Sequence, residues 1–316
     1  DKLTADAFAK LLMNVENGWS LTNNDRVMTE VKTGDETTGY KIEGLAPGYY
    51  LIVDDSTDDP ISGNKGDNYS AYIVKLLDQD LELQPKKETS EIDKTIADAP
   101  TADDLTLKIG DKSYSIGDDV PFVVTAKIPV TQLEYFALKD APTFKVTFRD
   151  AMSPSLTLKK DTFQVSIRKS EAVAGQILDI DSYSPVVGED AIYENAKEGY
   201  QKFNVTIDNL FDFITTAKED WPATDGFVYV DLSYKATLNE NAYVLGGGSD
   251  LAENMNNAYL TTSNDPNSDT EGDGTSTPEV PVPVYTFTLD GTKIAGEKND
   301  NGENVPLAGA TFKLYK

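Results

Sequence analysis

Residues 228–238 read VYVDLSYKATL, and every second side chain in this stretch is apolar or aromatic. Successive side chains of a β-strand point to opposite faces, so a period of two predicts a strand with one face against a core. The same alternation recurs in residues 120–128 and 144–148. Many such strands, separated by turns rich in Gly, Pro and Asp, predict an all-β chain built on an antiparallel sandwich.

The N-terminal part of the chain combines one helix signal with several short strands. Residues 4–15 carry apolar side chains at the three- and four-residue spacing of one helix face, and Thr4 can cap this helix. Residues 39–54 (GYKIEGLAPGYYLIVD) predict two strands joined at the Ala-Pro-Gly turn. Further strands are expected at residues 70–77 and 81–83.

Two breaks in the pattern divide the chain. Pro85 opens a connector rich in lysine and acids, and residues 264–283 form a linker of Asp, Ser, Thr, Gly and Pro. Between them, residues 169–200 are a more polar insertion, with a helix expected near residues 191–197. The expected domains are a first one lacking its N-terminal part (1–87), a middle one (88–278) and the truncated start of a third (279–316).

The composition argues against several classes of function. Lys and Arg total 28 against 54 Asp and Glu, a net charge of −26, and so acidic a surface repels nucleic acids and anionic membranes. The 316 residues include no Cys and no His, which excludes Ser-His-Asp and Cys-His triads and zinc sites of the His or Cys type. The sequence has no apolar run near the ~20 residues of a membrane span and opens without a visible secretory signal.

A few polar residues fall in phase with core positions. Lys94 shares its strand face with the isoleucines two residues before and after it. Asp150 shares its face with the alternating apolar residues of 144–148. Asn254 and Asn256 are in phase with the apolar residues that follow them. If these strands pack as their apolar neighbours demand, a lysine, an aspartate and an asparagine point into one core.

Such a group of side chains has a defined chemistry. Burial of a lone charge costs several kcal/mol, and it lowers the pKa of a lysine and raises that of an aspartate. A neutral lysine amine is a nucleophile, an asparagine amide offers an acyl carbon, and a protonated aspartic acid can move the proton to departing ammonia. The hypothesis is an intramolecular Lys–Asn isopeptide bond. Against it, a single lysine at a strand start is most often a solvated edge residue, and spacing alone does not bring the three residues together.

Five stretches carry a family resemblance. They are residues 44–54 (GLAPGYYLIVD), 148–158 (FRDAMSPSLTL), 234–244 (YKATLNENAYV) with 253–266 (ENMNNAYLTTSNDP), and 305–316 (VPLAGATFKLYK). In this order and spacing they resemble the backbone, or major shaft, pilins of Gram-positive sortase-assembled pili. The resemblance implies tandem Ig-like β-sandwich domains of the CnaA and CnaB types in a rod. It also implies an extracellular, wall-anchored pilus as the location.

In that family a pilin motif ending in Tyr-Pro-Lys lies between the first two domains. Residues 83–86 (LQPK) stand in that place, with Gln84 where the family usually has Tyr. The resemblance therefore implies that Lys86 is the lysine that a pilus-specific sortase joins to the neighbouring pilin subunit. Lys87 is the alternative.

The resemblance also implies roles inside the domains. Lys94 and Asn256 would form the internal bond of the middle domain, with Asn254 as the alternative asparagine and Asp150 as the catalytic acid. Lys293, in phase with the apolar residues of 285–294, would be the lysine of the last domain, with its partner absent from the chain. Asp54 falls where CnaB domains with a bond keep a glutamate, and we expect no bond in the first domain.

The function expected from these observations is a structural shaft subunit whose only chemistry is its own single cross-linking reaction. The alternative is a wall-anchored adhesin that binds a host protein or glycan through the insertion at 169–200, and a glycosidase is a more distant third. We expect no cofactor and no metal site. Clustered acids in the linker offer oxygens of the kind that calcium binds, but a solvated linker is the favoured interpretation. These acids are Asp265, Asp269, Glu271 and Asp273.

Overall fold

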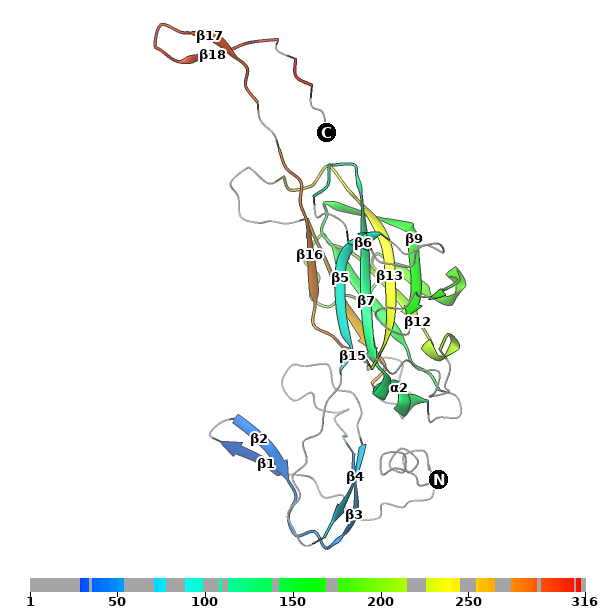
Figure 1. Ribbon diagram of the computed structural model, residues 1–316. Helices are drawn as coiled ribbons and strands as arrows, with labels where there is room; N and C mark the ends of the chain where they lie inside the picture. Colours follow the sequence, from blue (N-terminus) through cyan, green and yellow to red (C-terminus); the bar gives the residue numbers. More distant parts are fainter. Residues whose placement is uncertain are drawn as a thin grey trace.

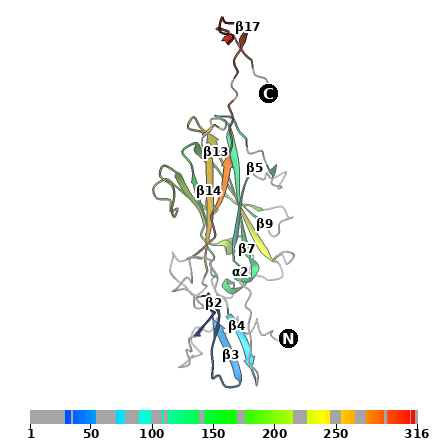
Figure 2. The same ribbon diagram turned by 90° about the vertical axis from the view of Figure 1, so that its left-hand side faces the viewer.

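The computed structural model describes three groups of strands that follow one another along the length of the molecule (Figures 1 and 2). The structure describes residues 29–33, 36–53, 71–77, 89–98, 108–109, 113–137, 142–168, 176–214, 226–244, 254–264, 274–288, 291–309 and 311–313. The helix expected at residues 4–15 and the strand expected at residues 81–83 lie outside these ranges.

The middle group is a sandwich of two antiparallel sheets, and the expectation of an all-β fold is confirmed. One sheet has the order β10-β9-β13-β7-β5-β6, with bounds Gln176–Ile177, Leu156–Arg168, Phe227–Leu238, Asp119–Pro129, Glu91–Asp98 and Lys108–Ile109. The other has the order β11-β12-β8-β14, with bounds Ser184–Val187, Gln201–Ile207, Val146–Met152 and Asn254–Thr262. Two more strands, β15 (Thr275–Ser276) and β16 (Val280–Val284), pair with β14.

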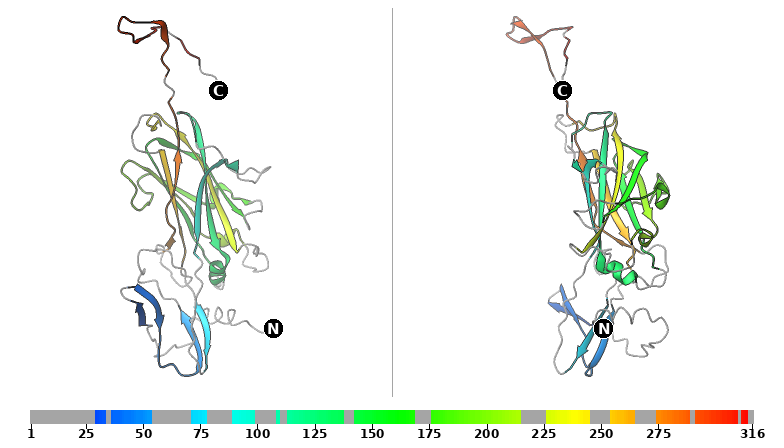
Figure 3. Two further views of the ribbon diagram at one scale, coloured as in Figure 1. Left: turned by 60° about the vertical axis from the view of Figure 1, so that its left-hand side comes forward. Right: turned by 45° about the vertical axis from the view of Figure 1, so that its right-hand side comes forward.

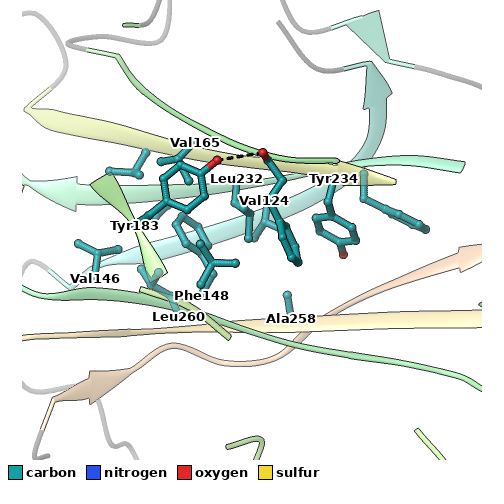
Figure 4. Packing of buried hydrophobic residues seen from close by; sticks show 14 of the residues in the cluster. Val124, Val146, Phe148, Val165, Tyr183, Leu232, Tyr234, Ala258 and Leu260 are labelled. Carbon is teal, nitrogen blue, oxygen red and sulfur yellow. Dashed lines mark hydrogen bonds between the residues drawn. The ribbon is translucent and has the colours of Figure 1, made fainter. Parts of the chain in front are cut away.

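The two sheets enclose one apolar core (Figure 4). The alternating residues of β13, from Val228 to Leu238, are each at most 2% exposed. The matching set of the neighbouring strand β7 in the same sheet, from Val120 to Ile128, is fully buried. Since burial of apolar surface is the main favourable contribution to folding, the alternation of these two strands determines which face of their sheet packs against the other sheet.

Strand β16 corrects the expected linker at residues 264–283. Its sequence, VPVPV, alternates Val with Pro, and the inward Val282 and Val284 are 4% and 1% exposed. Proline cannot donate to a sheet ladder and is therefore confined to edge strands. β16 meets this condition because β14 is the strand it pairs with. Residues 280–284, beyond the expected boundary at 278, thus belong to the sheet of the middle sandwich.

A short helix, α2 (Val130–Phe136), follows β7 directly and was not expected from the sequence. Seven residues are too few for a helical period to stand out. Tertiary contacts hold the helix in place: Leu133 is fully buried, and the ring of Phe136 meets that of Phe144 edge-on with centroids 4.9 Å apart. Gln132 Nε2 also donates to the carbonyl of Ser263 at 2.7 Å.

In the insertion, the helix expected near residues 191–197 is wrong. The described residues of this segment form β10, a 3-10 turn (Ile180–Ser182) and β11, followed by turns. The side chain of Asn204 on β12 holds the backbone of Ile192 in a non-helical form, because it accepts from the Ile192 N–H and donates to the Ile192 carbonyl at 2.7 and 2.9 Å. Asn195 then turns the chain with φ at 58°. A second 3-10 turn follows β12 at Leu210–Asp212.

Smaller strand pairs lie at the two ends of the sandwich (Figure 3). At the blue end, β1 (Thr29–Thr33) pairs with β2 (Glu36–Lys41), and β3 (Gly48–Val53) pairs with β4 (Ala71–Leu76), which confirms strands within residues 39–54 and 70–77. At the red end, β17 (Ile294–Lys298) pairs with β18 (Asn304–Pro306). β17 begins only at Ile294, so no strand spans the described residues of 285–294.

Among the described residues, no helix combines the length and the apolar character needed to cross a membrane.

Replacement of Leu133 by Ala should lower the free energy of unfolding by about 2–5 kcal/mol, because it leaves a cavity between α2 and the core. Ile192→Ala is the matched apolar control, since that side chain is 61% exposed, and its effect should stay within about 0.5 kcal/mol. Urea unfolding measures both variants. Equal losses would contradict the packing of α2 against the core.

Candidate functional site

The structure brings together the three polar residues that the sequence places in phase with the core. Lys94 comes from β5 in one sheet, and Asp150 and Asn256 come from the neighbouring strands β8 and β14 of the other. All three are buried, with exposed fractions of 5%, 1% and 0%. In each strand the apolar residues two positions away are buried or partly buried. Residues two apart share a face, so the polar side chains point inward as well.

Lys94 is the centre of the contacts between these groups. Its Nζ donates to Asp150 Oδ2 at 2.7 Å and to Asn256 Oδ1 at 2.7 Å. The first contact is also an ion pair whose side chains are 0% and 1% exposed. Lys94 and Asn256 are 162 residues apart in the chain, so the pair joins the two sheets across the core.

Tyr234 of β13 is a fourth member that sequence reasoning placed only in the apolar core. Its hydroxyl donates to Asp150 Oδ2 at 2.7 Å and accepts from Asn256 Nδ2 at 2.8 Å. The signal that could have identified it is its hydroxyl, the one polar group among the inward-facing side chains of residues 228–238. The four side chains form a closed ring of hydrogen bonds.

Aromatic rings form the walls of the site. Tyr234 stacks on Phe122 of β7, with ring centroids 5.5 Å apart and planes inclined by 25°. Lys94 Nζ lies 5.5 Å from the centroid of Phe122 and 5.7 Å from that of Tyr234. Such a wall excludes water, and a low local dielectric strengthens both the hydrogen bonds and the penalty for any charge that lacks a partner.

Burial changes the acid–base properties of the ring. It lowers the pKa of Lys94 to about 8, although the nearby carboxylate of Asp150 opposes the shift. Burial likewise raises the pKa of Asp150, against the opposing effect of Lys94 and of the hydroxyl of Tyr234. Both shifts favour the uncharged forms, a free amine and a carboxylic acid. Asp150 Oδ1 is buried and has no hydrogen-bond partner among the described residues, which is a further cost to its ionised form.

The arrangement presents a nucleophile to an acyl group. The nitrogen of Lys94 is in hydrogen-bond contact with the amide oxygen of Asn256, so the amide carbon lies next to it. An acid that can accept and return a proton contacts the same nitrogen. Attack of an amine on an amide needs a deprotonated amine, a proton for the leaving nitrogen and exclusion of competing water. The geometry supplies the groups for each of these needs.

Asn254, the alternative asparagine, is engaged elsewhere. Its Oδ1 accepts from the N–H of Tyr243, and its Nδ2 donates to the carbonyls of Tyr243 and Val284, at 2.8, 3.0 and 2.9 Å. Asn254 therefore connects β14 to a loop and to β16, whereas the side chain of Asn256 contacts Lys94.

The other residues singled out from the sequence are not part of this site. Lys86, Lys87 and Asp54 lie outside the described residues, as do the four acids of the linker. Lys293 is described and exposed, and its role in a last domain stays a prediction.

Several solved structures are similar to this chain. The pilus backbone protein RrgB of Streptococcus pneumoniae is 19% identical over 57% of this chain and 54% of that chain, with a TM-score of 0.31. BcpA, the major pilin subunit of Bacillus cereus, is 19% identical over 71% and 51%, with a TM-score of 0.37. The T6 backbone pilin of Streptococcus pyogenes is 18% identical over 77% and 47%, with a TM-score of 0.41.

All three proteins are backbone or major pilins, the class that the sequence motifs resemble. The match spans about half of the length of each. No protein-family model matches the sequence, and a search of curated proteins finds no match. Because each TM-score is below 0.5, the proposals that follow depend on the geometry and sequence of this chain.

Replacement of Asn254 by Ala should lower the free energy of unfolding by about 1–3 kcal/mol, because backbone groups of Tyr243 and Val284 lose buried partners. Asn241→Ala, an exposed asparagine near the same loop, is the matched control and should change the stability by less than about 0.5 kcal/mol. Urea unfolding measures both. A neutral Asn254→Ala variant would contradict the anchoring role.

Proposed function

We propose that Lys94 and Asn256 join in an intramolecular isopeptide bond and that the chain is a structural shaft subunit of a pilus. One observation carries the proposal: the buried contact of 2.7 Å between Lys94 Nζ and Asn256 Oδ1, with Asp150 on the same nitrogen. In the reaction, the amine nitrogen bonds to Asn256 Cγ, and the bond from Cγ to Nδ2 breaks. One amine proton leaves with Nδ2 as ammonia, and Asp150 returns to its starting protonation state.

The proposed bond is a staple for the sandwich. It joins β5, the first strand of the sandwich, to β14 in the opposite sheet, and closes a loop of 162 residues. By the chain-entropy argument used for disulfides, such a loop restrains the unfolded state by about 5 kcal/mol. A chain without cysteine would obtain in this way a covalent link that does not depend on redox conditions.

The shaft role adds intermolecular links. Lys86 is proposed as the lysine that a pilus-specific sortase joins to the neighbouring subunit, with Lys87 as the alternative. Support comes from the position of the LQPK motif just before the sandwich and from the resemblance of the motifs to backbone pilins. The expected location is the outside of the cell, in a wall-anchored pilus. The internal reaction occurs once per molecule, so the chain is not proposed to be an enzyme.

A second candidate function is adhesion to a host protein or glycan through the insertion. Three apolar side chains on this segment are exposed, a feature of many interaction surfaces. They are Ile180, Val186 and Ile192, with exposed fractions of 63%, 39% and 61%. An adhesin that is not polymerised has no need of Lys86, so this lysine discriminates between the two functions.

The isopeptide bond is tested by the intact mass of the purified chain. We expect the mass to be lower than that of the sequence by one ammonia molecule, with the linked peptides containing Lys94 and Asn256. The variants Lys94→Met, Asp150→Ala and Asn256→Ala should keep the full mass, and they should unfold at lower temperature and be cleaved faster by trypsin because they lack the staple. Asn254→Ala is the matched control and should still lose ammonia.

Full mass in the unaltered chain would refute the internal bond. Ammonia loss in Asn256→Ala but not in Asn254→Ala would instead assign the bond to the alternative asparagine.

The sortase link is tested by incubating the chain with a pilus sortase and a peptide that carries a sorting signal. We expect peptide mapping to find the peptide attached to Lys86, with attachment lost in Lys86→Arg and retained in Lys87→Arg. Attachment lost only in Lys87→Arg would select the alternative lysine. Attachment at neither lysine would contradict the shaft role and favour the adhesin.

A further inference from the structure

We propose that Tyr234 is a catalytic residue of the cross-linking reaction, which carries the proton from Asp150 to the departing nitrogen of Asn256. This inference depends on the proposed function, because the reaction itself is part of that proposal. From the sequence, Asp150 was expected to give the proton to the departing ammonia. In the structure, the hydroxyl of Tyr234 contacts that nitrogen.

The hydrogen bonds define which groups can exchange protons directly. Asp150 Oδ2 is in contact with Lys94 Nζ and with the hydroxyl of Tyr234, each at 2.7 Å. Its other oxygen, Oδ1, lacks a partner within the described part of the chain. The leaving nitrogen, Asn256 Nδ2, donates to the hydroxyl of Tyr234 at 2.8 Å. The Tyr234 hydroxyl is therefore the group that connects the acid with the leaving nitrogen.

The hydroxyl is held in this position by the core. The ring of Tyr234 packs between Phe122, Phe163 and Phe203, with centroid distances of 5.5, 6.0 and 4.9 Å. Figure 4 shows the ring extending from its own sheet toward the strand that carries Ala258, which is the strand of Asn256. A buried ring with two rotatable side-chain bonds loses little freedom on reaction, so its hydroxyl is preorganised between the two groups.

The protons balance around the ring of four residues. The neutral amine of Lys94 bonds to Asn256 Cγ, and the electron pair of the C=O bond moves onto Oδ1. Tyr234 gives its hydroxyl proton to Nδ2 and takes the proton of Asp150. The C–Nδ2 bond then breaks as the C=O bond re-forms, and ammonia leaves. The nitrogen of Lys94 gives one proton to Asp150, which restores the acid, and the tyrosine has already regained its proton from Asp150.

The direction of the hydrogen bond to Nδ2 agrees with this order of events. In the planar amide, the lone pair of nitrogen is delocalised into the carbonyl, so Nδ2 is a donor and the hydroxyl accepts. After the amine attacks, the carbon is tetrahedral and the lone pair of Nδ2 is free. Nδ2 then becomes an acceptor, and the same contact carries a proton in the opposite direction. No side chain has to move to make this change.

Burial also determines how the phenol can act. Its burial, and then the nearby Asp150, raise the pKa of Tyr234 well above its ordinary value. A free phenolate is therefore disfavoured. The hydroxyl can pass a proton only if it gains one as it loses one, and the contact with Asp150 provides this route.

The test compares Tyr234→Phe with a matched control, Tyr183→Phe. Tyr183 is a buried tyrosine of the same core, and its hydroxyl donates to the backbone carbonyl of Phe163 at 2.9 Å instead of to a group of the reacting ring (Figure 4). Both full-length variants and the unaltered chain are made by cell-free synthesis and quenched in acid at intervals. Intact mass then gives the fraction that has lost ammonia, and near-ultraviolet circular dichroism of each purified protein reports its fold.

We expect Tyr234→Phe to fold and to lose ammonia about 10²-fold or more slowly than the unaltered chain, the range of general acid–base contributions. Tyr183→Phe should react at the rate of the unaltered chain. Equal rates in Tyr234→Phe and the unaltered chain would overturn the role of the tyrosine and leave the isopeptide bond in place. No ammonia loss from the unaltered chain would overturn the proposed function itself, so the two failures are distinguishable.

A second replacement covers the case in which Tyr234→Phe does not fold. The residue 3,5-difluorotyrosine at position 234 keeps the ring and the hydroxyl and makes the hydroxyl more acidic. A relay hydroxyl gives one proton and takes another, and a change in its acidity alters both transfers, so the rate of ammonia loss should change. The same replacement at position 183 should leave the rate unchanged. An unchanged rate at position 234 would overturn the proposal.

Discussion

The burial of the lysine amine of β5 between two sheets is the constraint on which the rest of the site depends. An ammonium ion without a partner in this core would cost several kcal/mol. The structure meets that cost with the carboxyl group of Asp150, the amide of Asn256 and the aromatic faces around them. The carboxyl group and the amide are also participants in the proposed reaction. Burial favours the neutral, nucleophilic amine, and these contacts hold it against the amide that it would attack.

A second buried ion pair in the same sandwich shows why the type of cation matters. Arg168 contacts Asp231 through Nε and a terminal nitrogen at 2.6 and 2.9 Å, and Thr125 donates to the same carboxylate at 2.7 Å. A guanidinium does not lose its proton inside proteins, so it remains a cation and no nucleophile results. Lysine can become neutral when it is buried. Both pairs are largely buried, but only the pair with lysine can supply a neutral amine that attacks an amide.

The sequence was sufficient to predict those strands in which every second side chain is apolar or aromatic. Strict alternation predicted β7 and β13, and it placed Lys94, Asp150 and Asn256 on inward faces. It could not decide between Asn254 and Asn256, because both are inward and only the pairing across the sheets separates them. Tyr234 was missed because a tyrosine in an apolar phase resembles any other core residue. β16 was taken for linker because its prolines masked the alternation of its valines, and α2 depends on tertiary contacts that no short window of sequence contains.

The position of the proposed bond also determines how the sandwich would carry tension. The chain enters the sandwich at β5 and leaves it after β16 (Figure 1). With Lys94 joined to Asn256, force applied at these two points bypasses residues 95–255, which hold nearly all of the apolar core. The load that remains falls on the pairing of β16 with β14, where Val284 lies opposite Asn254, two residues from the bond. Extension is then limited to the segment after Asn256, and residues 95–255 are not extended even if β16 and its buried valines are pulled away. A disulfide at the same place would act in the same way, but an amide bond keeps this property under reducing conditions.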